Sequence, residues 1–197
     1  IKNTIYTIIG ATNGYLVLDK TPVDVSVRSL ANIVLVSLAD MRFMPLALTA
    51  PVSAPSIDYP WVIWKNAYRN DFAKVGSIYN IETGQLNYLP VPGDKPLGHY
   101  FVGDEYIGWQ LLLRDLQPLR MIALYSIDDN IFYIIGTEDE NLYISSYEVY
   151  DGHIYWVVRE DWESADLSST ICSAPVSEVI SNATDITVAE PTPNPNW

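Results

Sequence analysis

The chain has 197 residues and a formal net charge of −13, from 11 basic and 24 acidic side chains. This length is enough for one domain, or two small ones, with a substantial core. Apolar residues make up 49% of the chain and charged residues 18%, which excludes wholesale disorder. Because Cys172 is the only cysteine, an intrachain disulfide and a multi-cysteine metal site are excluded as well.

The acidic side chains are concentrated in the second half of the chain. Residues 1–100 hold eight basic and seven acidic side chains, a net charge of +1, whereas residues 101–197 hold three and 17, a net charge of −14. Such a half repels phosphate groups, so we expect neither nucleic-acid binding nor attachment to an anionic lipid surface. No apolar run approaches the roughly 18 residues that span a membrane, so we expect no membrane insertion.

In chain order, the sequence predicts short strands separated by turns and no helix of useful length. The best helical candidate, Gln110–Leu116, is too short to stand alone. Pro51 and Pro55 obscure one strand near the start of the second quarter, and Glu82-Thr83-Gly84 and Asp128-Asp129-Asn130 are predicted turns. The expected strands cover residues 5–9, 15–18, 33–39, 61–64, 77–81, 85–91, 99–102, 106–109, 121–127, 131–135, 145–150 and 153–156.

Two series of residues recur with a period of about 46. A turn followed by an aromatic or aliphatic strand appears four times, and these strands end at Leu18, Trp64, Trp109 and Trp156, with spacings of 46, 45 and 47. A second series follows each strand by 13–15 residues and contains Ile33, Ile78, Ile122 and Ile171, spaced by 45, 44 and 49. We expect the tryptophans at this repeat position to pack in the core between neighbouring repeats.

Four units of this length, each with four short antiparallel strands, are typical of a β-propeller. The segment Gly76–Leu86 resembles the blade hairpin of TolB-type and related propellers, and Trp61–Trp64 resembles their central strand. This resemblance implies an all-β, propeller-like repeat fold and assigns no functional residue. The alternative fold is a two-sheet β-sandwich, because 16 short strands can also be divided in that way.

We expect one repeat domain over residues 1–189, with repeats at about 1–49, 50–97, 98–143 and 144–189. A proline-rich, extended tail over residues 190–197 follows it. The first repeat begins with its own first strand, so no spare strand is left to close a ring. Four such units form either a small closed ring or part of a larger ring that another chain or further residues complete.

Long connections between the second and third strands of each repeat carry opposite charges close together. A polar rim of this kind suits ligand or partner binding, and ordinary solvated loop composition is the alternative. Trp61 and Trp162 lie outside the tryptophan repeat position, which favours exposed aromatic contacts. The candidate binding residues are Trp61, Arg69, Asp71, Arg159, Asp161, Trp162, Glu163 and Asp166.

We expect no catalytic residue and no cofactor. The acidic loop from Glu160 to Asp166 offers oxygen ligands that suit Ca²⁺, although it lacks the fixed pattern of an EF-hand loop. His99 and His153 lie beside turns, where packing or surface roles are expected, and no Gly-x-Ser-x-Gly or phosphate-binding motif is present. Cys172 is expected to be a small core residue.

The chain begins at Ile1, which is consistent with a removed leader or a longer product, and Asn182-Ala183-Thr184 matches an N-glycosylation acceptor. Both features favour an exported protein. We predict a non-enzymatic structural or binding module at an extracellular, cell-surface or virion location, which associates with itself or with another surface protein through its loop faces. The alternatives are a carbohydrate-active enzyme or lectin and an intracellular protein-interaction propeller.

Overall fold

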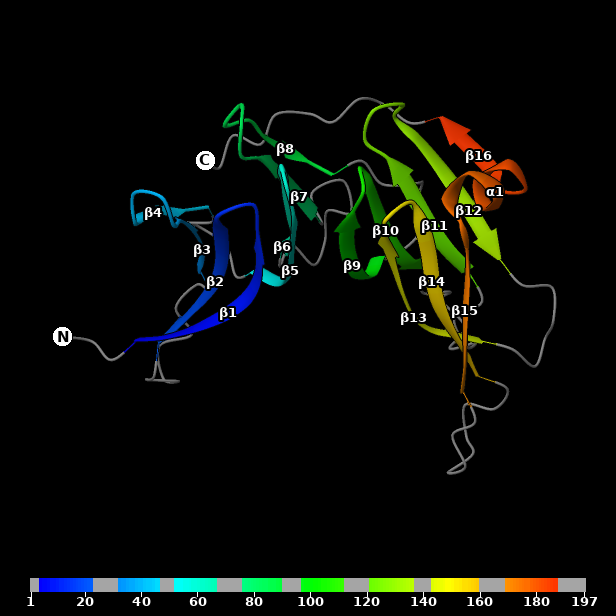
Figure 1. The fold of residues 1–197 in the computed structure, drawn as a ribbon, viewed down its shortest axis with the longest axis horizontal. Helices are drawn as coiled ribbons and strands as arrows, with labels where there is room; N and C mark the ends of the chain where they lie inside the picture. The colour runs from blue at the N-terminus through cyan, green and yellow to red at the C-terminus, as the bar shows by residue number, and fades with distance from the viewer. Residues whose placement is uncertain are drawn as a thin grey trace. The chain divides into compact units, whose positions relative to one another are not determined.

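The structure is a computed structural model that describes residues 4–22, 32–46, 52–66, 76–89, 97–111, 121–136, 143–159 and 169–187. These residues form four antiparallel sheets and one short helix (Figure 1). The predicted all-β, propeller-like repeat fold is therefore confirmed, and a sandwich of two sheets is not formed. The chain divides into two compact units, the first with strands β1–β8 and the second with the remaining elements. The predicted tail at residues 190–197 lies outside the described residues.

The first unit contains two four-stranded sheets, each with its strands in chain order. Sheet 1 consists of β1 (Thr4–Thr12), β2 (Tyr15–Pro22), β3 (Asn32–Ser37) and β4 (Arg42–Pro45). Sheet 2 consists of β5 (Val52–Asp58), β6 (Trp61–Asn66), β7 (Gly76–Asn80) and β8 (Leu86–Tyr88).

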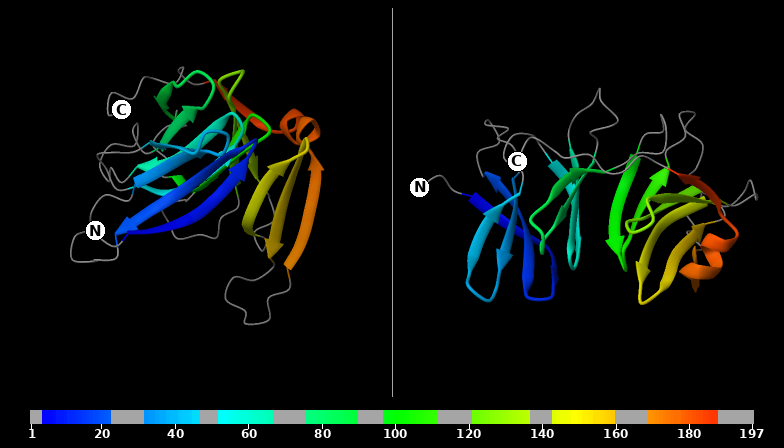
Figure 2. Two further views of the ribbon diagram at one scale, coloured as in Figure 1. Left: turned by 60° about the vertical axis from the view of Figure 1, so that its left-hand side comes forward. Right: turned by 90° about the horizontal axis from the view of Figure 1, so that it is seen from above.

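The second unit contains a five-stranded and a three-stranded sheet. Sheet 3 has the order β16 (Thr184–Thr187), β12 (Ile131–Gly136), β11 (Met121–Ser126), β10 (Tyr106–Leu111) and β9 (Leu97–Gly103). Sheet 4 consists of β13 (Tyr143–Tyr150), β14 (His153–Arg159) and β15 (Ser169–Pro175), and helix α1 (Val176–Ser181) follows it directly (Figure 2).

The last repeat departs from the prediction of four strands in each sheet. Its fourth strand, β16, pairs with β12 of sheet 3 instead of with β15 (Figure 1). The segment after β15 forms α1, because Pro175 ends the strand and Val176, Val179 and Ile180 give the next turn an apolar stripe at helical spacing. Helix α1 carries the chain from the edge of sheet 4 to sheet 3.

One copy of the second repeat series differs in register from the other three. Ile33, Ile122 and Ile171 each face the fifth residue of the preceding strand, namely Asp19, Gln110 and Val157. Ile78 instead faces Ile63, the third residue of its preceding strand. A shift of two residues keeps every side chain on the same face of the sheet, so hydrophobic alternation does not reveal it.

Two predicted elements also differ locally from the structure. The strand that Pro51 and Pro55 obscured is β5, in which an irregularity between Ser53 and Ser56 accommodates Pro55. Gln110 and Leu111, which began the best helical candidate, end strand β10 instead, because they continue its ladder with β11 and β9. Residues 112–116 of that candidate lie outside the described residues.

Three of the four tight turns between first and second strands have positive φ angles at both central residues. The pairs are Asn13-Gly14, with φ of +41° and +79°, Asp104-Glu105, with +47° and +69°, and Asp151-Gly152, with +50° and +70°. Positive φ at both positions matches the type I′ turn that joins twisted antiparallel strands, and glycine favours its second position. Glu105 occupies that position without the freedom of glycine.

Replacing Glu105 with glycine is expected to raise the free energy of unfolding by about 0.5–1 kcal/mol, because glycine adopts a φ of +69° without steric strain. Chemical denaturation of the variant and the parent measures this difference. Gly152→Ala, the reverse change at the equivalent turn position, is the matched control and is expected to destabilise the protein. A less stable Glu105→Gly chain would contradict the explanation.

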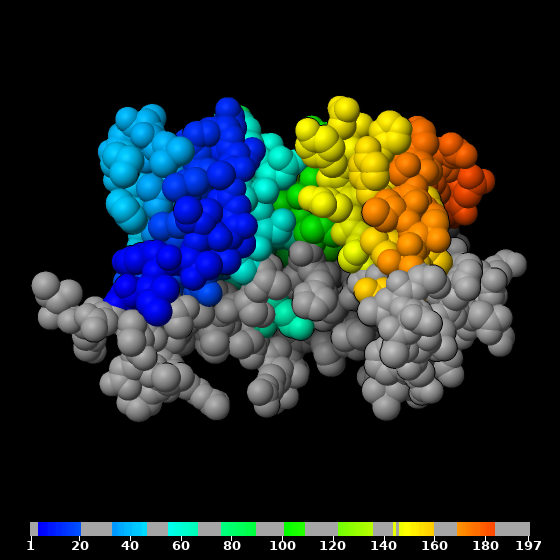
Figure 3. Space-filling model, turned by 60° about the horizontal axis from the view of Figure 1, so that its bottom comes forward, coloured from blue at the N-terminus to red at the C-terminus, as the bar shows by residue number. Residues whose placement is uncertain are grey.

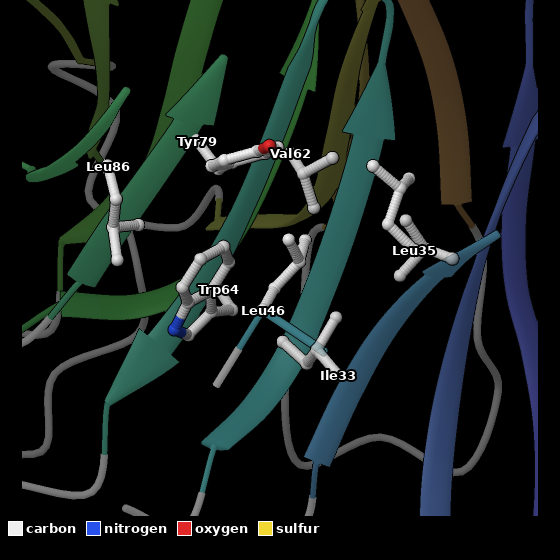
Figure 4. Packing of buried hydrophobic residues seen from close by; sticks show 8 residues of the cluster. Ile33, Leu35, Leu46, Val62, Trp64, Tyr79 and Leu86 are labelled. Carbon is white, nitrogen blue, oxygen red and sulfur yellow. The ribbon is translucent and has the colours of Figure 1, made fainter. Parts of the chain in front are cut away.

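Within the first unit, the two sheets pack face to face, and the two faces in contact are of opposite kinds. We call the face that carries the second and fourth residues of a sheet's second strand its front face, and the opposite face its back face. The back face of sheet 1, with Val17, Ile33 and Leu35, packs on the front face of sheet 2, with Val62 and Trp64 (Figure 4). These side chains are almost completely buried, so this contact forms the core of the unit.

The second unit repeats the same arrangement. The back face of sheet 3, with Ile122 and Leu124, packs on the front face of sheet 4, with Val149, Ile154 and Trp156. On β15, the residues opposite Ile154 and Trp156 are the small Ala174 and Cys172. Val176, Val179 and Ile180 of α1 complete this cluster, so the helix contributes the apolar side chains that a fourth strand supplies in sheet 2.

Candidate functional site

Three of the predicted binding and modification residues lie within the described residues: Trp61, Arg159 and Asn182. The structure does not describe the remaining six, which are Arg69, Asp71, Asp161, Trp162, Glu163 and Asp166. The long connections predicted to form a binding rim are thus represented only by the strand residues that flank them.

Trp61 is the first residue of β6 and is half-buried. Two residues earlier in the chain, Tyr59 makes an aromatic contact that the sequence did not predict. The rings of Tyr15 and Tyr59 stack with centroids 6.0 Å apart and planes inclined by 21°. The Tyr59 hydroxyl donates a 2.9 Å hydrogen bond to Glu82, and this bond raises the pKa of Tyr59. The sequence offers one signal for an aromatic group in this unit: Tyr15 and Trp61 are each the first residue of the strand that follows a tight turn.

Arg159 and Asn182 lie in the second unit. Arg159 ends β14, and its buried Nε has no hydrogen-bond partner among the described residues. Asn182 caps the C-terminal end of α1, where its side-chain amide donates to the carbonyl oxygen of Glu178 at 3.0 Å. Its side chain is exposed at this end of the helix.

The described residues contain no group of three or more His, Cys, Asp and Glu side chains that could hold a metal ion. His153 is exposed beside its turn, with Nδ1 3.0 Å from the carbonyl oxygen of Asp151 and its ring 6.2 Å from that of Tyr155. Cys172 is a free, half-buried thiol at the margin of the core. The predicted acidic loop at residues 160–166 is outside the described range.

The front face of sheet 1 carries apolar side chains that reach solvent. Leu18, Val34 and Val36 form its buried middle. Around them, Tyr6, Ile8 and Phe43 are 49%, 66% and 57% exposed. The ladders place all three on this face, because Tyr6 lies opposite Lys20, Ile8 opposite Leu18, and Phe43 opposite Val36.

The back face of sheet 4 is the second exposed surface with large apolar groups. Tyr150, Tyr155 and Ile171 lie on it by register and are 70%, 39% and 76% exposed. Glu148 and Ser173 flank Tyr155 on the neighbouring strands. Strands β13–β15, in yellow to orange, and β1 and β2, in dark blue, reach the molecular surface in Figure 3.

Tyr147 lies on the front face of sheet 4, and its hydroxyl group is buried without a hydrogen-bond partner among the described residues. Its ring meets Phe101 edge-on, with centroids 4.8 Å apart, and Gly108 leaves the space that both rings occupy. Burial raises the pKa of Tyr147 well above its usual value of 10.0, because the charged form would be unsolvated.

Replacing Tyr147 with phenylalanine is expected to raise the free energy of unfolding at neutral pH by about 1 kcal/mol, because an unpaired buried hydroxyl is removed. Above about pH 10 the unfolded state ionises first, so this tyrosine makes the parent protein less stable as pH rises. The variant lacks this loss. Urea denaturation of both proteins at neutral pH and above pH 10 measures the difference, and parallel pH profiles would contradict it.

The sequence matches no protein-family model and no curated protein. Among solved structures, the chain is similar to the CRINKLY WD40 ectodomain of the Arabidopsis thaliana receptor kinase ACR4, with 9% identity and a TM-score of 0.46 over 88% of this chain and 64% of that one. It is also similar to BamB from Moraxella catarrhalis, with 13% identity and a TM-score of 0.40 over 82% of this chain and 41% of that one. The chain thus spans less than two thirds of either structure. The propeller-type description rests on the sheets and their packing.

The only helix in the described part of the chain, α1, has six residues. No helix there is long and apolar enough to span a membrane.

Proposed function

We propose that this chain is a non-enzymatic protein-binding scaffold at an extracellular, cell-surface or virion location, which associates with itself or with another surface protein. One observation carries the proposal. Ten large hydrophobic side chains are exposed among those that the structure describes: eight lie on strands of sheets 1 and 4, and the other two, Leu38 and Met41, lie in the β3–β4 turn of sheet 1. Exposed apolar groups gathered on particular surfaces are typical of protein-binding sites.

The sheet arrangement supports this scaffold role. In both units a back face meets a front face through well-packed side chains. Exposed strands with large apolar groups therefore present surfaces of the same kind as those that already bind one another inside the chain. The exposed Asn182 at the end of α1 supports an exported location, because N-glycosylation needs an accessible acceptor.

A second candidate function is a lectin or carbohydrate-active enzyme. The stacked Tyr15 and Tyr59 give the first unit an aromatic pair of the kind that stacks on sugars, and Trp61 follows two residues further along the chain. The carboxylate of Glu82, bonded to Tyr59, adds a hydrogen-bond acceptor. This candidate differs from the first in its ligand and in the residues on which binding depends.

Sedimentation velocity over a wide concentration range and a glycan array together test the proposal. A scaffold is expected to associate with itself or with a surface protein and to leave the array unbound. Glycan binding that Trp61→Ala and Tyr59→Phe abolish would favour the lectin candidate and overturn the proposal. Expression in glycosylating cells, with Asn182→Gln as the control, tests location separately: a mass increase confined to the parent shows that Asn182 is modified.

A further inference from the structure

The two sheet contacts inside the chain follow one rule, in which a back face covers the front face of the next sheet. By register, Leu16 and Leu18 of sheet 1 correspond to Val62 and Trp64 of sheet 2, since they are the second and fourth residues of their strands. Phe43 corresponds to Leu86. Each lies on the fourth strand of its sheet and pairs with the third-strand residue that is opposite the second residue of the second strand. The front face of sheet 1 therefore has the pattern of a face that another sheet covers.

The back face of sheet 4 is equivalent by register to the back faces of sheets 1 and 3, each of which covers a neighbouring sheet. Tyr155 corresponds to Val17 of sheet 1 and Gly108 of sheet 3, the third residues of their strands. Ile171 corresponds to Ile33 and Ile122 in the same two sheets. Both Ile33 and Ile122 are 1% exposed against a neighbouring sheet, whereas Ile171 is 76% exposed.

From this equivalence we propose that the front face of sheet 1 binds the back face of sheet 4 of a second copy of this chain. The inference rests on the proposed scaffold function and names its partner. After one contact, one chain of the pair still has its sheet 4 face free and the other still has its sheet 1 face free, so the contact is head-to-tail, and repetition gives a filament or a closed ring of chains. The contact repeats the back-on-front packing that is already present in each unit.

Charge favours this pairing over a contact between two copies of sheet 4. Residues 1–100 carry a net charge of +1 and residues 101–197 a net charge of −14. Head-to-tail contact brings an acidic half against a nearly neutral one, whereas contact between two second halves brings together two strongly acidic surfaces. Glu148 lies opposite Tyr155 on the binding face, so its charge weakens the contact, and Glu148→Gln is expected to strengthen it.

The test uses two double variants of the full chain, each with one face disabled. Ile8→Asp with Phe43→Asp disables the front face of sheet 1, and Tyr150→Asp with Ile171→Asp disables the back face of sheet 4. All four side chains are more than half exposed, so folding is expected to be retained, and circular dichroism with thermal melting verifies it. Met41→Asp, a 62% exposed residue in the β3–β4 turn, is the matched control outside both faces.

Sedimentation velocity is expected to show that the parent and Met41→Asp assemble beyond dimers as concentration rises. Each double variant alone is expected to bind itself at least about tenfold more weakly, which corresponds to about 1.4 kcal/mol. An equimolar mixture of the two is expected to form a one-to-one dimer that grows no further, because one variant keeps the front face and the other the back face.

Three results would overturn the inference. If only the sheet 1 variant lost association, and mixing did not restore it, the contact would join two front faces. If neither variant altered association, self-binding would use another surface, and the scaffold proposal would stand. If the parent stayed monomeric at every concentration, the second copy would be the wrong partner, while binding of a different surface protein would remain open to the tests of the proposed function.

Discussion

Replacing Trp64 with alanine is expected to lower the free energy of unfolding by about 3–5 kcal/mol, the usual effect of removing a large buried aromatic side chain. Trp64 is 2% exposed and packs in one cluster with Val17, Ile33 and Leu35 across the contact between sheets 1 and 2. Few neighbours can move into the space, because the surrounding strands are fixed by their ladders. Urea denaturation followed by far-ultraviolet circular dichroism measures the loss.

Trp61→Ala is the matched control for this change. The two tryptophans are three residues apart on β6, but Trp61 is only half-buried at the end of the strand. Its replacement is expected to lower the free energy of unfolding by about 1 kcal/mol. Equal losses for both variants would show that Trp64 does not occupy the core position that the packing rule gives it.

Replacing Gly103 with alanine is expected to destabilise the protein by about 3 kcal/mol, because the added methyl group meets backbone that cannot move aside. A Cβ atom on Gly103 would collide with the carbonyl oxygen of Val149 and approach its carbonyl carbon to 3.1 Å. These residues belong to β9 and β13, the first strands of sheets 3 and 4. Thermal and chemical unfolding measure the effect.

Gly10→Ala is the corresponding control in the first unit. A Cβ atom there would come within 2.6 Å of the Cγ2 methyl group of Ile57, a side-chain atom that a change of χ1 can move, unlike backbone. The expected loss is therefore smaller, about 1 kcal/mol. A Gly103→Ala chain as stable as the parent would show that β9 and β13 do not approach as closely as the structure has them.

The sequence predicted the repeats and turns well because both leave strong local signals. Asn13-Gly14 and Asp151-Gly152 supply the residues that type I′ turns need, and each lies between alternating strands. The strand lengths between them set the period of about 46 residues. These features depend on neighbours in the chain, so they are legible without knowledge of the fold.

The remaining parts depend on contacts between distant segments. The pairing of Ile78 with Ile63 differs by two residues from the repeat alignment, and alternation is blind to such a shift. Helix α1 has only six residues, which gave too little periodicity to detect. The pairing of β16 with β12 follows from the edge that sheet 3 leaves open, and no local pattern indicates it.

The candidate surfaces were harder to predict than the fold. The charged connections favoured the loops as binding surfaces, whereas most of the exposed apolar groups that the structure describes lie on strands of sheets 1 and 4. Ile8 and Ile171 look like ordinary core residues in the sequence, because the same alternation produces covered and uncovered faces. Only the number and order of packed sheets decides which of them stays exposed.

The crossing of the final strand has a consequence for synthesis on the ribosome. Sheet 3 gains its outermost strand through the pairing of Ile131 with Thr187, about 50 residues after β12 has emerged. Until then the free edge of β12 is open to wrong partners. The second unit is therefore expected to acquire resistance to proteolysis in one late step, so nascent chains halted before residue 184 should remain cleavable within β12.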